Sequence, residues 1–96
     1  MKAVFIICVP ALEKLVMDSL DKAGAKNYTK FPYILGEGGH SEPHLDTHVW
    51  PGANVGILAV TDEIKAKQLI SAIKELKKQY LKEGVKAFVL PIEEEI

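Results

Sequence analysis

The sequence contains no arginine: all twelve of its basic residues are lysines. A guanidinium group grips phosphate or carboxylate through two parallel hydrogen bonds, which an ammonium group cannot form, so a bidentate arginine site is excluded. The formal net charge is −1, from twelve lysines against thirteen acidic residues. Because phosphate binding needs an excess of clustered cations, we expect no nucleic acid as the main partner.

Cysteine and long apolar segments are also scarce. A single cysteine, Cys8, excludes an internal disulfide, and its apolar neighbours in residues 4–9 indicate a small buried side chain. This first apolar run is far shorter than the roughly 18 residues of a membrane span. A charged helical pattern follows it, not the small-residue cleavage site of a signal peptide. We therefore expect a soluble, cytoplasmic protein.

Hydrophobic periodicity divides the chain into alternating strands and helices. It predicts strands over residues 2–9, 28–35, 54–60 and 86–92, and helices over residues 11–23 and 63–83. Gly24 and Gly84 are the expected helix stops, and Thr61 or Asp62 is expected to cap the second helix. Pro32 lies within the second strand, where it indicates an edge strand or a bulge. A solvated helix surface is predicted for the lysines at positions 65, 67, 74, 77, 78 and 82.

The order of these elements is β-α-β, a long connection, and β-α-β. This order predicts one domain over residues 1–96 with an α+β, ferredoxin-like split βαβ fold: an antiparallel sheet with both helices on one face. The first and third strands are central in that topology, and both are apolar on both faces. Because two helices cover only one face, the other would stay exposed on a monomer. The sequence therefore predicts a homo-oligomer that packs sheet against sheet.

Residues 36–53 are the most informative segment, because loops of this length in small domains are usually functional or disordered. The segment contains every histidine of the chain. Ionisable side chains occupy every second position from 40 to 48: His40, Glu42, His44, Asp46 and His48. An extended chain would present these side chains on one side, whereas a helical turn opened by Pro43 would bring His44 and His48 together.

Imidazole and carboxylate groups in such an arrangement suit zinc, nickel, copper or iron(II). We therefore regard four residues as candidate metal ligands: His40, His44, Asp46 and His48. The alternative is that these are solvent-facing, hydrogen-bonding side chains, since their spacing matches no recognised metal motif. Histidine beside a carboxylate could also support acid–base chemistry. No serine or cysteine has the setting of a nucleophile, however, so we expect that the protein is not an enzyme.

Three glycines precede the histidines. Gly36, Gly38 and Gly39 allow backbone conformations that other residues avoid, and they could present amide N–H groups to an anion. No helix and no lysine directly follow them, so a hinge is the alternative role. Both roles remain open from the residues alone.

The architecture along nearly the whole chain resembles the PII-like signalling proteins. In sequence, the resemblance is clearest in residues 2–7 (KAVFII) and 44–52 (HLDTHVWPG), and the second segment looks like a divergent branch of that group. The resemblance implies a homotrimer that binds a small effector, such as an adenine nucleotide, in the clefts between subunits. It also implies that residues 36–53 change shape with the effector and dock on a partner, such as a membrane transporter or a metabolic enzyme.

The chain departs from the nitrogen-regulatory members of that group. Those members carry a glycine-rich phosphate loop between the second helix and the last strand, where only Gly84 and Lys86 could correspond here. Their phosphate-binding arginines and the modified tyrosine of their loop have no counterpart. The expected effector site is therefore built from Gly36, Gly38, Gly39 and Lys86. A transition-metal-binding protein for metal sensing or tolerance is the alternative function, and a purely structural oligomeric adaptor is a third.

Overall fold

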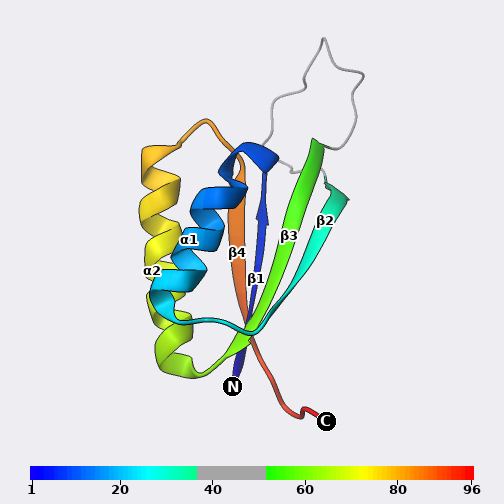
Figure 1. The fold of residues 1–96 in the computed structure, drawn as a ribbon, viewed down its shortest axis with the longest axis vertical. Helices are drawn as coiled ribbons and strands as arrows, with labels where there is room; N and C mark the ends of the chain where they lie inside the picture. Colours follow the sequence, from blue (N-terminus) through cyan, green and yellow to red (C-terminus); the bar gives the residue numbers. More distant parts are fainter. Residues whose placement is uncertain (37–51) are drawn as a thin grey trace.

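The computed structural model describes residues 1–36 and 52–96, and its elements follow the order predicted from the sequence (Figure 1). These elements are β1 (Lys2–Cys8), a 3-10 turn (Pro10–Leu12), α1 (Glu13–Ala23), β2 (Tyr28–Gly36), β3 (Gly52–Thr61), α2 (Glu63–Gln79) and β4 (Val85–Pro91). The first residues of β1 and β2 are as predicted, and the other strand ends differ from the predicted ones by one or two residues. The predicted α+β order is confirmed.

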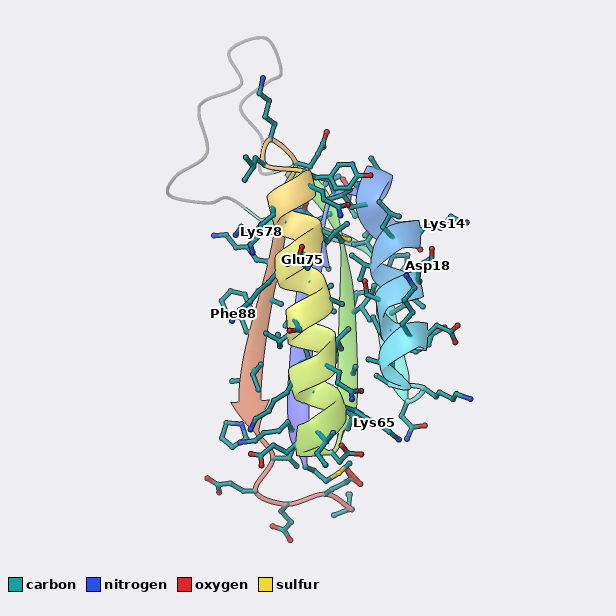
Figure 2. The ribbon with its side chains drawn as sticks, turned by 90° about the vertical axis from the view of Figure 1, so that its left-hand side faces the viewer. Lys14, Asp18, Lys65, Glu75, Lys78 and Phe88 are labelled. Carbon is teal, nitrogen blue, oxygen red and sulfur yellow. The ribbon has the colours of Figure 1, made fainter. Side chains whose placement is uncertain are left out.

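The described strands form one antiparallel sheet in the order β2-β3-β1-β4. As predicted, β1 and β3 occupy the centre, and β2 and β4 are the two edges. Figures 1 and 2 show both helices on the same face of this sheet. The prediction of a ferredoxin-like split βαβ fold is therefore confirmed.

The core lies between the sheet and the two helices. From the central strands it receives Val4, Ile6 and Cys8 of β1, which pair with Ala59, Ile57 and Val55 of β3, and all of them are buried. From the helical layer it receives Leu12, Val16, Leu20, Leu69, Ile73 and Leu76. Alternate strand residues meet an apolar stripe on each helix, as the periods of two and 3.6 residues require.

Two of the three helix ends that the sequence marked are confirmed, at Gly24 and at Asp62. Pro10 opens the 3-10 turn before α1, and Gly24 ends α1 in the left-handed region at φ +75°. At the start of α2, the Asp62 Oδ1 atom accepts a hydrogen bond from the Lys65 N–H at 2.8 Å. Thr61, the other candidate cap, instead belongs to β3 and is buried.

The predicted end of α2 is wrong. The helix ends at Gln79 with Tyr80 as its C-cap, four residues before the expected end at residue 83, so Gly84 is not its stop. The apolar stripe explains the early end: Leu81, the next apolar side chain, is 80% exposed and adds no burial that would hold another turn. Among the described residues, no helix is long and apolar enough to cross a membrane.

Pro32 was expected to mark either an edge strand or a bulge, and the structure shows both: β2 is an edge strand with a bulge at this residue. Phe31 pairs with Gly56 and Ile34 with Asn54, so two residues of β2 face the single residue Val55 of β3. The extra residue returns Ile34 to the face that Phe31 occupies, although the two are three positions apart.

The face of the sheet away from the helices, called here the open face, is apolar. Across the paired strands it carries Ala3, Phe5, Ile7, Phe31, Ile34, Leu58, Val60, Phe88 and Leu90. Phe88 and Leu90 of β4 are 50% and 49% exposed in the single chain. The apolar surface that was predicted for the central strands thus continues onto both edge strands.

Gly56 lies beneath the side chains of Phe5, Phe31 and Ile34 on the open face and leaves room for them to pack together. The Phe5 and Phe31 ring centroids lie 6.0 Å apart at an interplanar angle of 53°. A Cβ atom at residue 56 would lie 3.0 Å from Ile34 Cδ1 and 3.1 Å from Phe5 Cε1. A side chain here would therefore push this cluster apart, which explains a glycine in the middle of a central strand.

Candidate functional site

The described candidate effector residues lie at one end of the sheet. Gly36 is the last residue of β2 and pairs with Gly52, the first residue of β3. Lys86 is the second residue of β4, and β4 starts at this same end. Figure 1 shows this end at the top. The two candidates therefore share one end of the molecule.

Gly36 and Lys86 nevertheless lie at opposite edges of the sheet. The order β2-β3-β1-β4 separates their strands by three inter-strand steps. At roughly 4.8 Å per step, the lateral separation is about 14 Å. One chain therefore does not bring them together, and a site that uses both requires a second copy of the chain.

The backbone at Gly36 is that of an ordinary strand residue. Among the glycines that the structure describes, only Gly24 has a positive φ. A Cβ atom at Gly36 would lie 3.7 Å from Asn54 Nδ2, an ordinary contact, and that nitrogen donates a hydrogen bond to the Gly52 carbonyl at 3.0 Å. The special backbone freedom of glycine is therefore not used at Gly36. Gly38 and Gly39 lie outside the described residues.

Lys86 is exposed and shares the open face with Ile7, its partner on β1. The turn that leads into β4 is held by two hydrogen bonds of 3.0 Å, from the Val9 N–H to the Gly84 carbonyl and from the Glu83 N–H to the Tyr80 carbonyl. These bonds fix the start of β4 and hence the position of the Lys86 backbone.

Lys82 is a second lysine at the end of the sheet where β4 begins, and the sequence analysis did not place it there. It was expected on the solvated side of a helix extending to residue 83, but the helix ends earlier and Lys82 lies in the turn before Lys86. Neither ammonium group forms an ion pair within residues 1–36 and 52–96. In the sequence, the apolar stripe of the second helix ends at Tyr80. This pattern could have predicted that the helix stops there and that Lys82 lies in the following turn.

The candidate metal ligands His40, His44, Asp46 and His48 all lie outside the described residues. In the part of the chain that the structure describes, no group of three histidine, cysteine, aspartate or glutamate side chains could hold a metal ion. The metal site therefore stays a prediction from sequence.

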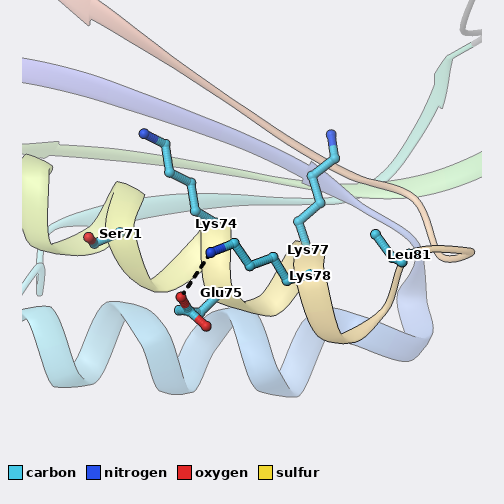
Figure 3. A pocket seen from close by; sticks show the side chains of 6 residues that line it. All are labelled: Ser71, Lys74, Glu75, Lys77, Lys78 and Leu81. Carbon is cyan, nitrogen blue, oxygen red and sulfur yellow. Dashed lines mark hydrogen bonds and ion pairs between the residues drawn. The ribbon is translucent and has the colours of Figure 1, made fainter.

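The outer surface of α2 carries a shallow hollow of about 390 Å³. Its lining, shown in Figure 3, consists of Ser71, Lys74, Glu75, Lys77, Lys78 and Leu81. The Lys78 Nζ and Glu75 Oε1 atoms form an exposed ion pair at 3.5 Å, a type of contact that contributes little stability. The lysines of this surface are exposed, in agreement with the predicted solvated side of the helix.

Cys8 lies near the same end as Lys86, but its side chain points into the core and is fully buried. Burial raises the pKa of the Cys8 thiol to about 11, and the negative charge of Glu13 adds to the shift. Glu13 itself forms an ion pair with Lys30 of β2. The thiol therefore stays protonated at neutral pH, which makes it a core side chain and not a nucleophile.

We expect Cys8 in the folded protein to remain unreactive toward a thiol reagent such as Ellman's reagent at neutral pH. The thiolate is the reactive form, and both its low population and its burial protect it. In denaturant the same cysteine should react completely within minutes. Rapid reaction of the native protein would show that the β1 end opens to solvent.

Known proteins resemble this chain in sequence and in fold. The family model for nitrogen regulatory protein P-II matches residues 1–96. No curated protein matches the chain. Among solved structures, CPII of Thiomonas intermedia K12 bound to ADP and bicarbonate is 28% identical, with a TM-score of 0.69, over 92% of this chain and 81% of that one.

Two further structures are similar over most of their length. CPII bound to ADP, AMP and acetate is 25% identical, with a TM-score of 0.70, over 95% of this chain and 84% of the other. A candidate PII-like signalling protein from Thermus thermophilus is 26% identical, with a TM-score of 0.60, over 92% of this chain and 82% of that one.

Proposed function

The chain belongs to the nitrogen regulatory protein P-II family, and on that premise we propose that it is a homotrimeric signalling protein. An adenine nucleotide binds between its subunits, and residues 36–53 transmit the bound state to a partner protein. The observation that carries this proposal is the position of Gly36 and Lys86, at one end of the sheet but on opposite edges. Only a second copy can complete a site that uses both.

The open face supports assembly through the sheets. Its apolar side chains run across every described strand, and Phe88 and Leu90 are half exposed in the single chain. Contiguous apolar surface of this kind usually marks a protein interface. Burial of the face against other copies would remove it from water and stabilise the trimer.

The nucleotide assignment draws on the similar structures and on the charges at the sheet end. CPII, 28% identical to this chain, binds ADP and bicarbonate. Here Lys82 and Lys86 supply ammonium groups near the start of β4 that form no ion pair within the described residues. With no arginine in the chain, these lysines must neutralise phosphate charge as point charges. Partners would then read the nucleotide state through the segment that joins β2 to β3.

Replacement of Lys86 with alanine is the direct test of the nucleotide site. We expect ADP to bind the Lys86→Ala variant about tenfold more weakly, because one charge-assisted hydrogen bond to phosphate is lost. Isothermal titration calorimetry, with and without added bicarbonate, measures the change. Lys22→Ala is the matched control, since Lys22 is exposed at the other end of the molecule, in the last turn of α1.

Equal ADP affinity in Lys86→Ala, Lys22→Ala and the unmodified protein would remove Lys86 from the site. Native mass spectrometry of the untagged protein tests the wider proposal, because it reports subunit number and bound mass together. A trimer that gains the mass of ADP supports the proposal. A monomer, or a trimer that binds no adenine nucleotide, contradicts it.

The metal hypothesis rests on the spacing of the histidines and has a separate test. If His44 and His48 are ligands, replacing both with alanine should abolish stoichiometric zinc or copper binding, because two of the predicted donors are lost. Metal content after equilibrium dialysis measures this. Unchanged stoichiometry in the double variant would reject the metal site without affecting the nucleotide proposal.

A further inference from the structure

A groove lies between α2 and the edge strand β4, on the helix side of the sheet. Figure 2 shows these two elements side by side. It has a volume of about 360 Å³ and is lined by Lys2, Glu63, Ala66, Lys67, Ile70, Ser71, Lys74 and Val89. The site proposed above lies where β4 begins. Lys2 and Glu63 instead place the groove toward the other end of the sheet, where β4 finishes. The groove is thus separate from the proposed nucleotide site and from the open face.

The floor of the groove is apolar because the helical layer leaves the edge of the sheet uncovered. Val89 pairs with Val4, so its side chain points toward the helices. Val4 is fully buried, whereas Val89 is 47% exposed. Ala66 and Ile70 of α2 complete the apolar floor. An apolar strip thus remains open to solvent beside α2.

The rim of the groove is basic. Lys2, Lys67 and Lys74 lie along it, with Glu63 as the acidic member of the lining. None of these three lysines forms an ion pair within the described ranges 1–36 and 52–96. A ligand for this groove should therefore combine several negative charges with an apolar side chain.

The chain itself contains a segment of that chemistry. Residues 93–96 have the sequence Glu-Glu-Glu-Ile, and all four are exposed. The last hydrogen bond that ties the region to the sheet joins the Ile92 N–H to the Met1 carbonyl at 3.2 Å. Beyond it, three carboxylates precede an isoleucine that is fully exposed in the single chain.

A chain cannot easily place this segment in its own groove. Figure 1 shows residues 93–96 continuing away from the end of the sheet. To enter the groove they would have to reverse direction immediately after Ile92, and this stretch contains no glycine. A fully extended segment of four residues spans only about 14 Å. The turn back toward the groove would use most of this length, so little of the segment could lie in the groove.

We propose that residues 93–96 of one copy bind in the groove between α2 and β4 of a second copy. Ile96 packs on the apolar floor formed by Ala66, Ile70 and Val89. The glutamates lie beside Lys67 and Lys74 on the rim. Docking of this kind links neighbouring copies by charge and apolar contact on the helix side, independently of the open face.

Disulfide trapping tests this contact in the full chain. In an Ile70→Cys/Ile96→Cys variant, mild oxidation should produce covalently linked dimers and larger species on a non-reducing gel. Ile64→Cys/Ile96→Cys is the matched control, because Ile64 is an isoleucine of the same helix that is 71% exposed and outside the groove. Cys8 is buried and should not contribute.

Linked species in the groove variant and not in the control support the proposal. Equal linkage in both variants indicates random collision and overturns it, as does the absence of any linkage. A product that stays at monomer mass but changes mobility would show that each chain binds its own segment, which also overturns the proposal.

Exchanging the charges of the groove lysines and of the glutamates shows whether the disulfide reports a specific contact or only random collision of the introduced cysteines. Lys67→Glu/Lys74→Glu in the trapping variant should reduce the rate of linkage about tenfold at low salt, because two attractive contacts become repulsive. Addition of Glu93→Lys/Glu94→Lys/Glu95→Lys should restore the rate. A rate that neither falls nor recovers would show that the glutamates do not face these lysines.

Discussion

Replacement of Phe88 with glutamate is expected to dissociate the proposed trimer into folded monomers. Phe88 lies on the open face opposite Phe5, and half of its surface is exposed in the single chain. A glutamate at this position meets water in a free monomer but would be buried without a partner between assembled sheets. An unpaired buried carboxylate costs several kcal/mol, and each copy would carry one.

Size-exclusion chromatography with light scattering measures the outcome, and circular dichroism shows whether the monomers keep their secondary structure. Leu81→Glu is the control, because Leu81 is 80% exposed in the turn after α2 and lies off the sheet. Its assembly state should match that of the unmodified protein. If Phe88→Glu assembles normally while folded, the open face is not the interface, and the proposed packing of sheet against sheet is wrong.

Replacement of Ile73 with alanine is expected to lower the free energy of unfolding by about 3 kcal/mol. Ile73 is 4% exposed and packs in the core between α2 and the sheet. The substitution removes buried methyl and methylene groups and leaves a cavity that the neighbouring side chains fill only in part. Chemical denaturation measures the change, at one fixed protein concentration because assembly and folding are linked.

Ile64→Ala is the matched control for this prediction. It removes the same atoms from the same helix, but Ile64 is 71% exposed, so the change should stay within about 0.5 kcal/mol. Because both substitutions replace isoleucine with alanine in a helix, the change in helix propensity is shared and cancels in the comparison. Similar losses for the two variants would show that α2 does not pack through the face that carries Ile73.

Local sequence signals were sufficient for most element boundaries. Gly24 predicted the end of α1 because a left-handed C-cap favours glycine. Thr61 or Asp62 predicted the start of α2, and Asp62 is the cap because its carboxylate accepts from a free N–H. Pro32 predicted either an edge strand or a bulge because it has no N–H to donate, and β2 has both features. Each of these signals acts over a few residues, which is why the sequence could reveal them.

The end of α2 shows where such signals fail. Its residues continue with good helix formers after Gln79, and Gly84 offers a plausible stop. The helix ends earlier because the next apolar side chain, Leu81, is exposed and adds no buried contact that would stabilise another turn. As a result, Lys82 belongs with Lys86 in the candidate site and not with the helix surface. The candidate ligands between residues 37 and 51 remain predictions from sequence alone.

The sequence by itself determined the order of strands and helices, the two apolar faces of the central strands and the lack of any guanidinium site. Periodicity, composition and short-range capping encode these properties directly. Only the tertiary structure decided that the bulge returns Ile34 to the open face, that Lys82 joins Lys86, and that Val89 stays half exposed beside α2. These features depend on strand register and on how far each helix covers the sheet, which are set by contacts between residues distant in the chain.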